Sequence, residues 1–177
     1  MKFEIHFDEK LYRKQINLSF NISWEKSLKD STNAAIYALV FIALGIAMLL
    51  GNAKLGYLFL IFGISLIITA IIGLNKYLNA KKGTSKLLEK NIKFFNEKPI
   101  SIWEFENDYF RFEYFGGDFK FYWNYFKYYD IIDKNILFGT DANSQHFILS
   151  ECEVGTENFN QIAELLKEKI NTTKPSD

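Results

Sequence analysis

The chain has 177 residues, 49% of them hydrophobic, which leaves room for one ordinary domain beside membrane segments. Its net charge of zero conceals a basic stretch, residues 75–96 with six lysines and one glutamate, and an acidic one, residues 97–177 with eight Lys/Arg and fifteen Asp/Glu. The acidic part argues against nucleic acid as a partner, and the single cysteine, Cys152, excludes a disulfide within the chain and a cysteine-based metal site.

The first segment alternates apolar and polar residues. Phe3, Ile5 and Phe7 fall on one face of residues 2–7, which predicts a half-buried strand. Because a single strand is not stable alone, we expect it to pair with the sheet formed later in the chain. Asp8 is placed to cap a helix that begins at the next residue.

Two uncharged apolar runs follow. Residues 34–50 and 55–74 contain 17 and 20 residues, without Asp, Glu, Lys, Arg or His. A bilayer core needs about 20 apolar residues to span it, with about 17 as the lower limit, so both runs are predicted to be transmembrane helices. The short turn at residues 51–54 makes them an antiparallel hairpin. Without an ionisable residue in either span, a transporter, ion channel or proton relay is disfavoured.

Each apolar run carries small residues at intervals of four, and such stripes let helix backbones approach closely. We expect the stripes to pack the hairpin on itself; an interface between copies in a homo-oligomer is the alternative. The stripe residues are Ala43, Ala47 and Gly51 on the first predicted helix and Ser65, Thr69 and Gly73 on the second.

Lysines gather on the outer flanks of the hairpin, and the turn holds Lys54 alone. The positive-inside rule therefore places both termini in the cytoplasm. The segment after the second run is predicted to continue as a helix, with a break at Gly83 as the alternative. Its lysines either contact anionic lipids or only set the topology, and the sequence leaves both open. The candidate lipid contacts are Lys76, Lys81, Lys82 and Lys86.

After Pro99 the pattern changes from helical to alternating. We expect strands over residues 100–106, 109–115, 119–123, 125–132, 136–140 and 146–149, with turns at residues 107–108 and 116–117. Thr156 is predicted to cap a final helix. The apolar stripe of that helix consists of Phe159, Ile162, Leu165, Leu166 and Ile170.

This order of elements resembles a known family. The stretch GGDFKFYWNYFKYYDIIDKNILFGTDANSQHFILS, followed by FNQIAELLKEKI, is similar to the YcxB-like bacterial membrane proteins, in which two transmembrane helices precede strands and a terminal helix. The resemblance implies a C-terminal domain similar to pleckstrin-homology barrels and brings no established biochemical activity. Ser150 stands where the family commonly has proline; the matching residues are Gly116, Gly117, Trp123, Phe126, Ile136, Leu137, Phe147, Ile148 and Leu149.

Residues able to carry catalysis form no known motif in the sequence. His6 and His146 lie in different predicted strands, each without a ligand partner at metal-binding spacing, and no zinc, phosphate-loop or serine-hydrolase motif is present. We therefore expect no enzyme activity, no metal and no cofactor.

The aromatic residues between Phe119 and Tyr129 are the most unusual feature of the composition. Consecutive rings in a strand lie on both faces, so we expect some, such as Tyr122 and Tyr128, to point outward. The candidate partner-binding rings are Tyr122, Trp123 and Tyr128.

These features predict a transmembrane helical hairpin joined to an α+β domain, with an antiparallel pleckstrin-homology-like sheet or barrel and a C-terminal helix. The predicted parts are residues 1–30 (strand and helix), 31–75 (hairpin), 76–96 (basic juxtamembrane helix), 97–170 (domain) and 171–177 (disordered tail). We expect a bacterial inner-membrane protein whose cytoplasmic domain binds a protein or peptide partner at the bilayer. The alternative is a small immunity or stress protein that acts through its hairpin on another membrane protein.

Overall fold

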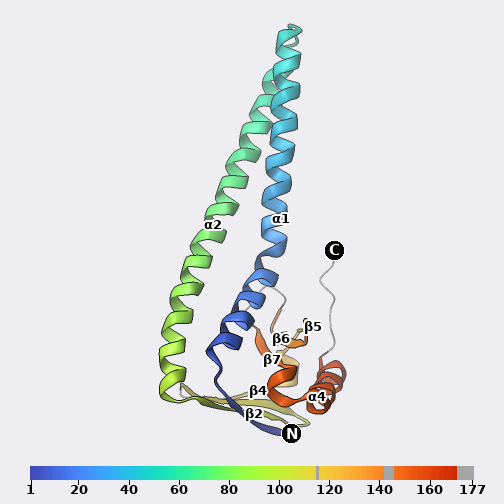
Figure 1. The fold of residues 1–177 in the computed structure, drawn as a ribbon. Coiled ribbons are helices and arrows are strands. Elements are labelled where there is room, and N and C mark those ends of the chain that lie inside the picture. The colour runs from blue at the N-terminus through green and yellow to red at the C-terminus, as the bar shows by residue number, and fades with distance from the viewer. Residues whose placement is uncertain (115, 142–145, 171–177) are drawn as a thin grey trace. The chain divides into compact units, whose positions relative to one another are not determined.

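The structure is a computed structural model that describes residues 1–114, 116–141 and 146–170; the predicted tail, 171–177, lies outside the described residues. The chain forms two compact units, one of Met1–Ser23 with Ser85–Asp177 and the other of Trp24–Thr84. Two helices of 42 residues, α1 (Glu9–Leu50) and α2 (Gly56–Glu97), contribute to both units (Figure 1). Helix α2 continues through Gly83, so the alternative of a break there is wrong.

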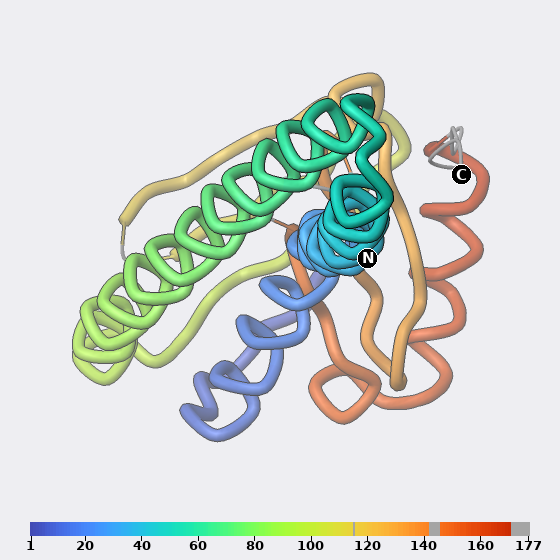
Figure 2. The backbone as a smooth tube through the Cα atoms, turned by 90° about the horizontal axis from the view of Figure 1, so that it is seen from above, coloured from blue at the N-terminus to red at the C-terminus, as the bar shows by residue number. Residues whose placement is uncertain are grey.

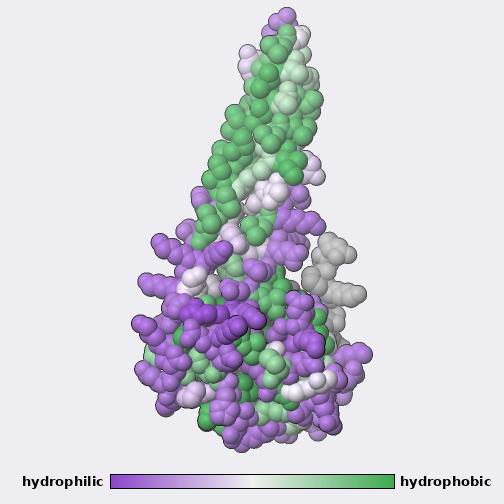
Figure 3. Space-filling model, viewed as in Figure 1, coloured by the Kyte–Doolittle hydropathy of each residue, from purple (hydrophilic) through white to green (hydrophobic). Residues whose placement is uncertain are grey.

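The unit of Trp24–Thr84 is a helical hairpin, with Asn52 in the left-handed region at its turn (φ 59°). Both helices are long and apolar enough to cross a membrane, by length and composition, and only 11% and 6% of their most apolar windows is buried. Hydrophobic residues cover the visible face of the hairpin (Figure 3). This exposure distinguishes the pair from core helices of a soluble protein, which are mostly buried.

Glycine residues bring the two helices of the hairpin into contact. A Cβ atom on Gly63 would lie 2.6 Å from Cγ1 of Ile42 and 3.1 Å from the carbonyl oxygen of Ala38. A Cβ atom on Gly56 would lie 2.6 Å from the carbonyl oxygen of Gly45. Such distances leave no room for a side chain, so the two backbones pack directly on each other along this face.

The structure corrects the predicted packing stripes. Gly73 does meet the other helix, at Ser31, but Gly51 has only atoms of its own helix end nearby. The other four predicted residues are exposed on the hairpin surface: Ala43, Ala47, Ser65 and Thr69. The helices instead pack at Ala38 and Gly45 of α1 and at Gly56 and Gly63 of α2, where small residues permit this close approach.

Replacement of Gly63 by leucine is expected to destabilise the hairpin by about 1–3 kcal/mol, since the new side chain must displace Ile42 and the α1 backbone. Titration of the detergent-solubilised protein with SDS measures the loss. The matched control is Ala47→Leu, at an exposed site on the same hairpin, which is expected to leave the transition nearly unchanged. Equal losses in both variants would contradict packing through the glycine face.

The other unit is built on two antiparallel sheets. The first has the order β1–β2–β3–β4, formed by Lys2–His6, Ile100–Phe105, Tyr109–Tyr114 and Gly117–Tyr122. The second has the order β5–β6–β7, formed by Tyr128–Ile132, Asn135–Gly139 and Phe147–Ser150. Strand β1 pairs with β2, which confirms that the N-terminal strand joins the later sheet. Asp8 Oδ1 accepts a hydrogen bond from the backbone N–H of Leu11 at 2.9 Å, as expected of a helix N-cap.

Side chains from both sheets and from helix α4 (Thr156–Lys169) form one core. Phe105, Phe110 and Phe138 lie at its centre, 0–2% exposed, with ring centroids 5.1–6.2 Å apart. Figure 2 shows α4, in red, alongside the orange strands of the second sheet. The predicted stripe of α4 is confirmed: Phe159, Ile162, Leu166 and Ile170 are buried, and Leu165 packs against them.

Two local predictions are wrong. Trp123–Tyr125 forms a short 3-10 helix, η1, and β5 begins only at Tyr128, so residues expected at strand ends form the crossing between the sheets. Gly155, not Thr156, is the N-cap residue of α4, and the Thr156 hydroxyl donates to Glu151 Oε1 at 2.6 Å.

The first turns of α1 cover the second sheet on the face away from the core. Leu18 and Ile22 pack against Tyr128, Leu137 and Ile148. In β6 and β7 these residues alternate with core residues, so the second sheet is buried on both faces. This explains the nearly continuous apolar sequence of β6 and β7.

Candidate functional site

A cleft of about 740 Å³ opens in the unit that contains the sheets. Its lining comes from the inner face of the first sheet, the first turns of α1, the last turns of α2 and the end of the second sheet. Residues from both ends of the chain therefore meet around it, and its size is that of a ligand-binding pocket.

Aromatic rings form the sheet side of the cleft. The rings on this side come from three neighbouring strands: Trp103 from β2, Phe112 from β3, and Phe119 and Phe121 from β4. The ring centroid of Tyr125, in η1, lies 5.7 Å from that of Phe121. Phe119 and Tyr125 are 39% and 54% exposed, whereas Trp103 is 8% exposed. The two exposed rings therefore offer apolar surface that the fold itself does not cover.

Three more rings form the helix side. Phe7 and Phe95 stack with centroids 5.0 Å apart and planes inclined by 13°, and Tyr12 meets Phe95 edge-on at 5.3 Å. Asn91 Nδ2 donates to the Tyr12 hydroxyl at 3.2 Å. Burial raises the pKa of Tyr12, so this hydroxyl is neutral at physiological pH. These contacts fix the end of α2 against the start of α1.

Polar groups occupy one end of the cleft and bond to one another. Glu153 Oε2 accepts from Gln15 Nε2 and from the amide of Ser150, both at 2.7 Å. Burial raises the pKa of the Glu153 carboxyl. The His146 ring is buried, with Nδ1 3.1 Å from the hydroxyl oxygen of Ser19. This end of the cleft therefore ties α1 to the β7–α3 connection (α3, Glu151–Val154).

Glu153→Gln is expected to stabilise the protein at pH 7. Because the folded pKa of Glu153 lies above its unfolded value near 4.5, the native protein loses stability relative to the variant as the pH rises from about 4.5 through the folded pKa. Chemical unfolding in detergent at a series of pH values measures the difference between the two proteins. A constant difference over the whole pH range would contradict the raised pKa.

The structure separates the three aromatic residues that the sequence analysis selected. Tyr122 is 59% exposed, whereas Trp123 is buried and donates its indole N–H to the Glu106 carbonyl oxygen at 2.9 Å. Tyr128 is also buried, and the prediction that it points outward is wrong because α1 covers that face of β5. None of the three lines the cleft.

Sequence reasoning missed Phe119 and Tyr125 as exposed residues of a cleft. The alternation in β4 does assign Phe119 to the inner face of the sheet. Only the strand order reveals that β4 is the edge strand, and the inner face of the sheet is less covered at this edge than at the other strands. Tyr125 belongs to η1, for which the alternating pattern gave no signal.

The four candidate lipid-binding lysines are all exposed on α2: Lys76, Lys81, Lys82 and Lys86. At about 100° per residue they surround the helix as a collar instead of lining one face. The Lys81 ammonium lies 6.0 Å from the centre of the Tyr77 ring.

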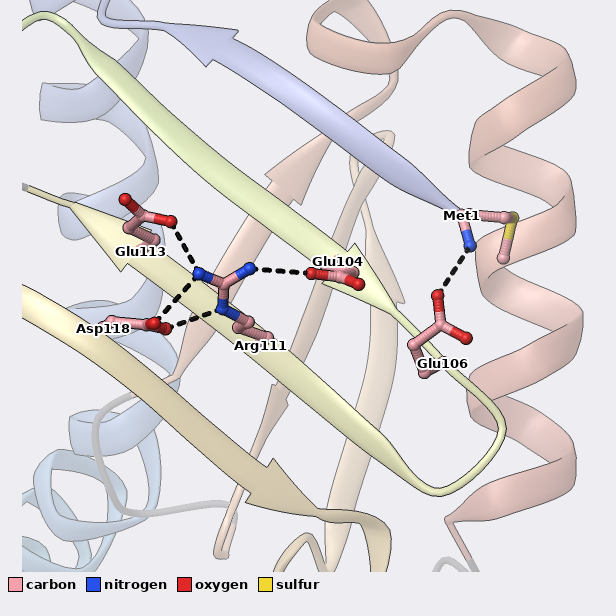
Figure 4. Close-up of polar contacts among 6 residues, drawn as sticks. All are labelled: Met1, Glu104, Glu106, Arg111, Glu113 and Asp118. Atoms are coloured by element: carbon pink, nitrogen blue, oxygen red, sulfur yellow. Dashed lines mark hydrogen bonds and ion pairs between the residues drawn. The ribbon is translucent and has the colours of Figure 1, made fainter.

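On the outer face of the first sheet, Arg111 connects three strands (Figure 4). Its guanidinium donates to Glu104 on β2 at 3.1 Å, to Glu113 on β3 at 2.9 Å and to Asp118 on β4 at 2.8 and 2.9 Å. One cation thus faces three carboxylates, and the cluster carries a net negative charge. Its partners are partly exposed, so it orders the strands more than it stabilises the fold.

The cleft offers exposed aromatic rings beside hydrogen-bonded polar groups. Among residues 1–114, 116–141 and 146–170, no three His, Cys, Asp or Glu side chains gather as a metal site. Cys152 is exposed and lies 3.3 Å from the Ser150 hydroxyl. The polar end of the cleft is internally hydrogen-bonded, and the exposed rings suit an apolar group.

No family model matches the chain, and neither the curated proteins nor the solved structures contain a significant match to it. The resemblance to YcxB-like proteins therefore stays a prediction.

Proposed function

We propose that this protein is a non-enzymatic docking module of a bacterial inner membrane, anchored by its helical hairpin, whose aromatic cleft binds a segment of a protein partner. The observation that carries the proposal is the cleft of about 740 Å³ with the uncovered rings of Phe119 and Tyr125. Such uncovered aromatic surface is typical of binding sites, because two ordered rings give a large contact area at low entropic cost.

The apolar surface of the hairpin supports membrane insertion. Leu39, Ile61 and Phe62 are 62–69% exposed, and burial of such side chains in lipid gains about 25 cal/mol per Å². The turn places one lysine, Lys54, at the far end, whereas the lysine collar follows on α2. This distribution supports a topology with both termini in the cytoplasm, whether or not the collar also binds anionic lipid.

Thiol labelling tests the topology. Lys54→Cys in a Cys152→Ser background is expected to react with a membrane-impermeant maleimide in intact cells, because the turn faces outward. The native Cys152, which is exposed in the fold, is expected to react only after permeabilisation. The reverse pattern would overturn the cytoplasmic placement of the folded domain.

The strand arrangement supports a pleckstrin-homology-like domain. The unit has two antiparallel sheets, of four and three strands, and a C-terminal helix. These are the kinds of element that the family resemblance implies. On this proposal, the transmembrane hairpin is an insertion between the first and second strands.

The cleft suits an apolar protein segment better than a lipid headgroup. Of the residues that line it, Lys90 is the one lysine, and Asp8 and Glu153 are acidic, so an anionic headgroup finds little compensating charge there. A segment with two or three apolar side chains contacts the exposed rings and leaves its backbone at the open side. Tethering to the bilayer raises the effective concentration of the cleft towards membrane partners.

A photo-crosslinking amino acid at Tyr125 tests the binding role in native membranes. We expect a discrete protein adduct from this position, since its ring borders the cleft and is 54% exposed. The same probe at Ile131, which is 43% exposed on β5 and outside the cleft, serves as the control and is expected to give far less adduct.

The identity of the adduct decides between functions. Lipid adducts at position 125 would replace the protein partner by a lipid ligand. A protein adduct from a probe at Ala47, exposed on the hairpin, without one at position 125 would favour action through the hairpin on another membrane protein.

A further inference from the structure

Strand β4 is an uncovered edge of the first sheet. Among the strands that the structure describes, it is the one without a buried residue, and Asp118, Phe119, Lys120 and Tyr122 are exposed. It pairs with β3 on one side and is last in the strand order. An edge of this length carries backbone N–H and C=O groups that are a template for another strand.

We propose that β4 pairs with β4 of a second copy of this chain, antiparallel about a two-fold axis at Phe119. The two four-stranded sheets then form one continuous sheet. In this register Asp118 of each copy lies opposite Lys120 of the other, and Phe119 lies opposite Phe119. The proposal stands apart from the function proposed for the cleft, since the pairing requires no ligand.

The residue pattern of β4 selects this register. Directly opposite residues in an antiparallel pair lie on the same face, so a shift by one residue would place charged residues opposite the inner rings. A two-fold axis at Asp118 or at Lys120 would place two like charges opposite each other, which is destabilising. With the axis at Phe119, both cross-strand charge pairs are attractive.

The inner face also fits. Phe121 of one copy lies opposite Gly117 of the other, which has no side chain of its own and is flanked by the Phe119 ring of its chain. Asp118 and Lys120 are two residues apart in β4 and therefore share the outer face, where Lys120 Nζ lies 3.7 Å from the centre of the Tyr109 ring of its own chain. Asp118 remains 54% exposed despite its contact with Arg111 (Figure 4).

The pairing has a consequence for the cleft. Phe119 lines it and is 39% exposed. In the dimer, Phe119 of the second copy lies beside this ring, so each copy adds an aromatic group at the border of its neighbour's cleft. Two clefts then lie on one face of a single sheet.

Disulfide trapping of purified full-length protein in lipid bilayers tests the pairing. In a Cys152→Ser background, Phe119→Cys is expected to form a covalent dimer on mild oxidation, because opposite residues have Cα atoms about 4.5–5.5 Å apart, within disulfide range. Ile131→Cys, at an exposed position on β5, is the control and is expected to stay monomeric. If Phe119→Cys gives no more dimer than this control, the proposal is wrong.

Charge reversal tests the register. Asp118→Lys or Lys120→Asp, each added to Phe119→Cys, turns both cross-strand pairs repulsive and is expected to lower dimer formation about tenfold. A mixture of the two variants with different tags restores opposite charges at both pairs. It is expected to give the mixed dimer at nearly the level of the parent.

The mixed dimer also controls for folding, because a misfolded variant cannot be rescued by its complement. Single reversals that trap as well as the parent, or a mixture that does not recover, would overturn the register.

Discussion

The ladder between β1 and β2 is the constraint on which the rest of the folded domain depends. It pairs the first residues of the chain with a strand that follows both long helices, and it extends from the contact of Met1 with Phe105 to the Phe7 amide bonded to the Pro99 carbonyl oxygen at 2.7 Å. The start of α1 and the end of α2 must therefore meet at one end of this ladder. Stacking of Phe7 on Phe95 and the two bonds from Arg13 to Glu89, at 2.6 and 3.0 Å, hold that meeting point together.

The cleft is a result of this arrangement. Helix α1 continues from the ladder over the second sheet, where Leu18 packs on the outer face and Gln15 and Ser19 contact Glu153 and His146 at the two ends of β7. Helix α4 closes the core on the other side. The inner face of the first sheet is thereby covered near β1 and β2 and left partly open towards β4. The gradient is visible in the exposure of the rings, from 2% at Phe105 to 39% at Phe119.

Much of this fold was predictable because its elements have strong periods. Alternation located most strands within one to three residues, and uncharged length located the hairpin. The packing face of the hairpin was harder, since small residues at intervals of four competed with two pairs that are seven residues apart, Ala38 with Gly45 on α1 and Gly56 with Gly63 on α2. A seven-residue interval matches the repeat of two packed helices and was the better signal.

The candidate site could not be predicted in the same way, because it is made by the strand order and by helices that return from far along the chain. Tyr128 looks like an outward residue of a two-sided strand, yet α1 buries it. Phe119 looks like a core residue, yet it lies at the edge of its sheet. Period alone distinguishes the two faces of a strand, whereas only tertiary structure determines whether each face is covered.

The distribution of charge favours protein over lipid at these surfaces. Residues 97–177 have an excess of acidic groups, and Arg111 is outnumbered by the carboxylates that it binds. On the proposed topology, an anionic leaflet repels such a domain while it attracts the lysines of α2. Exposed aromatic rings on an acidic domain that is tethered but repelled in this way remain accessible to other proteins, including a second copy of the chain.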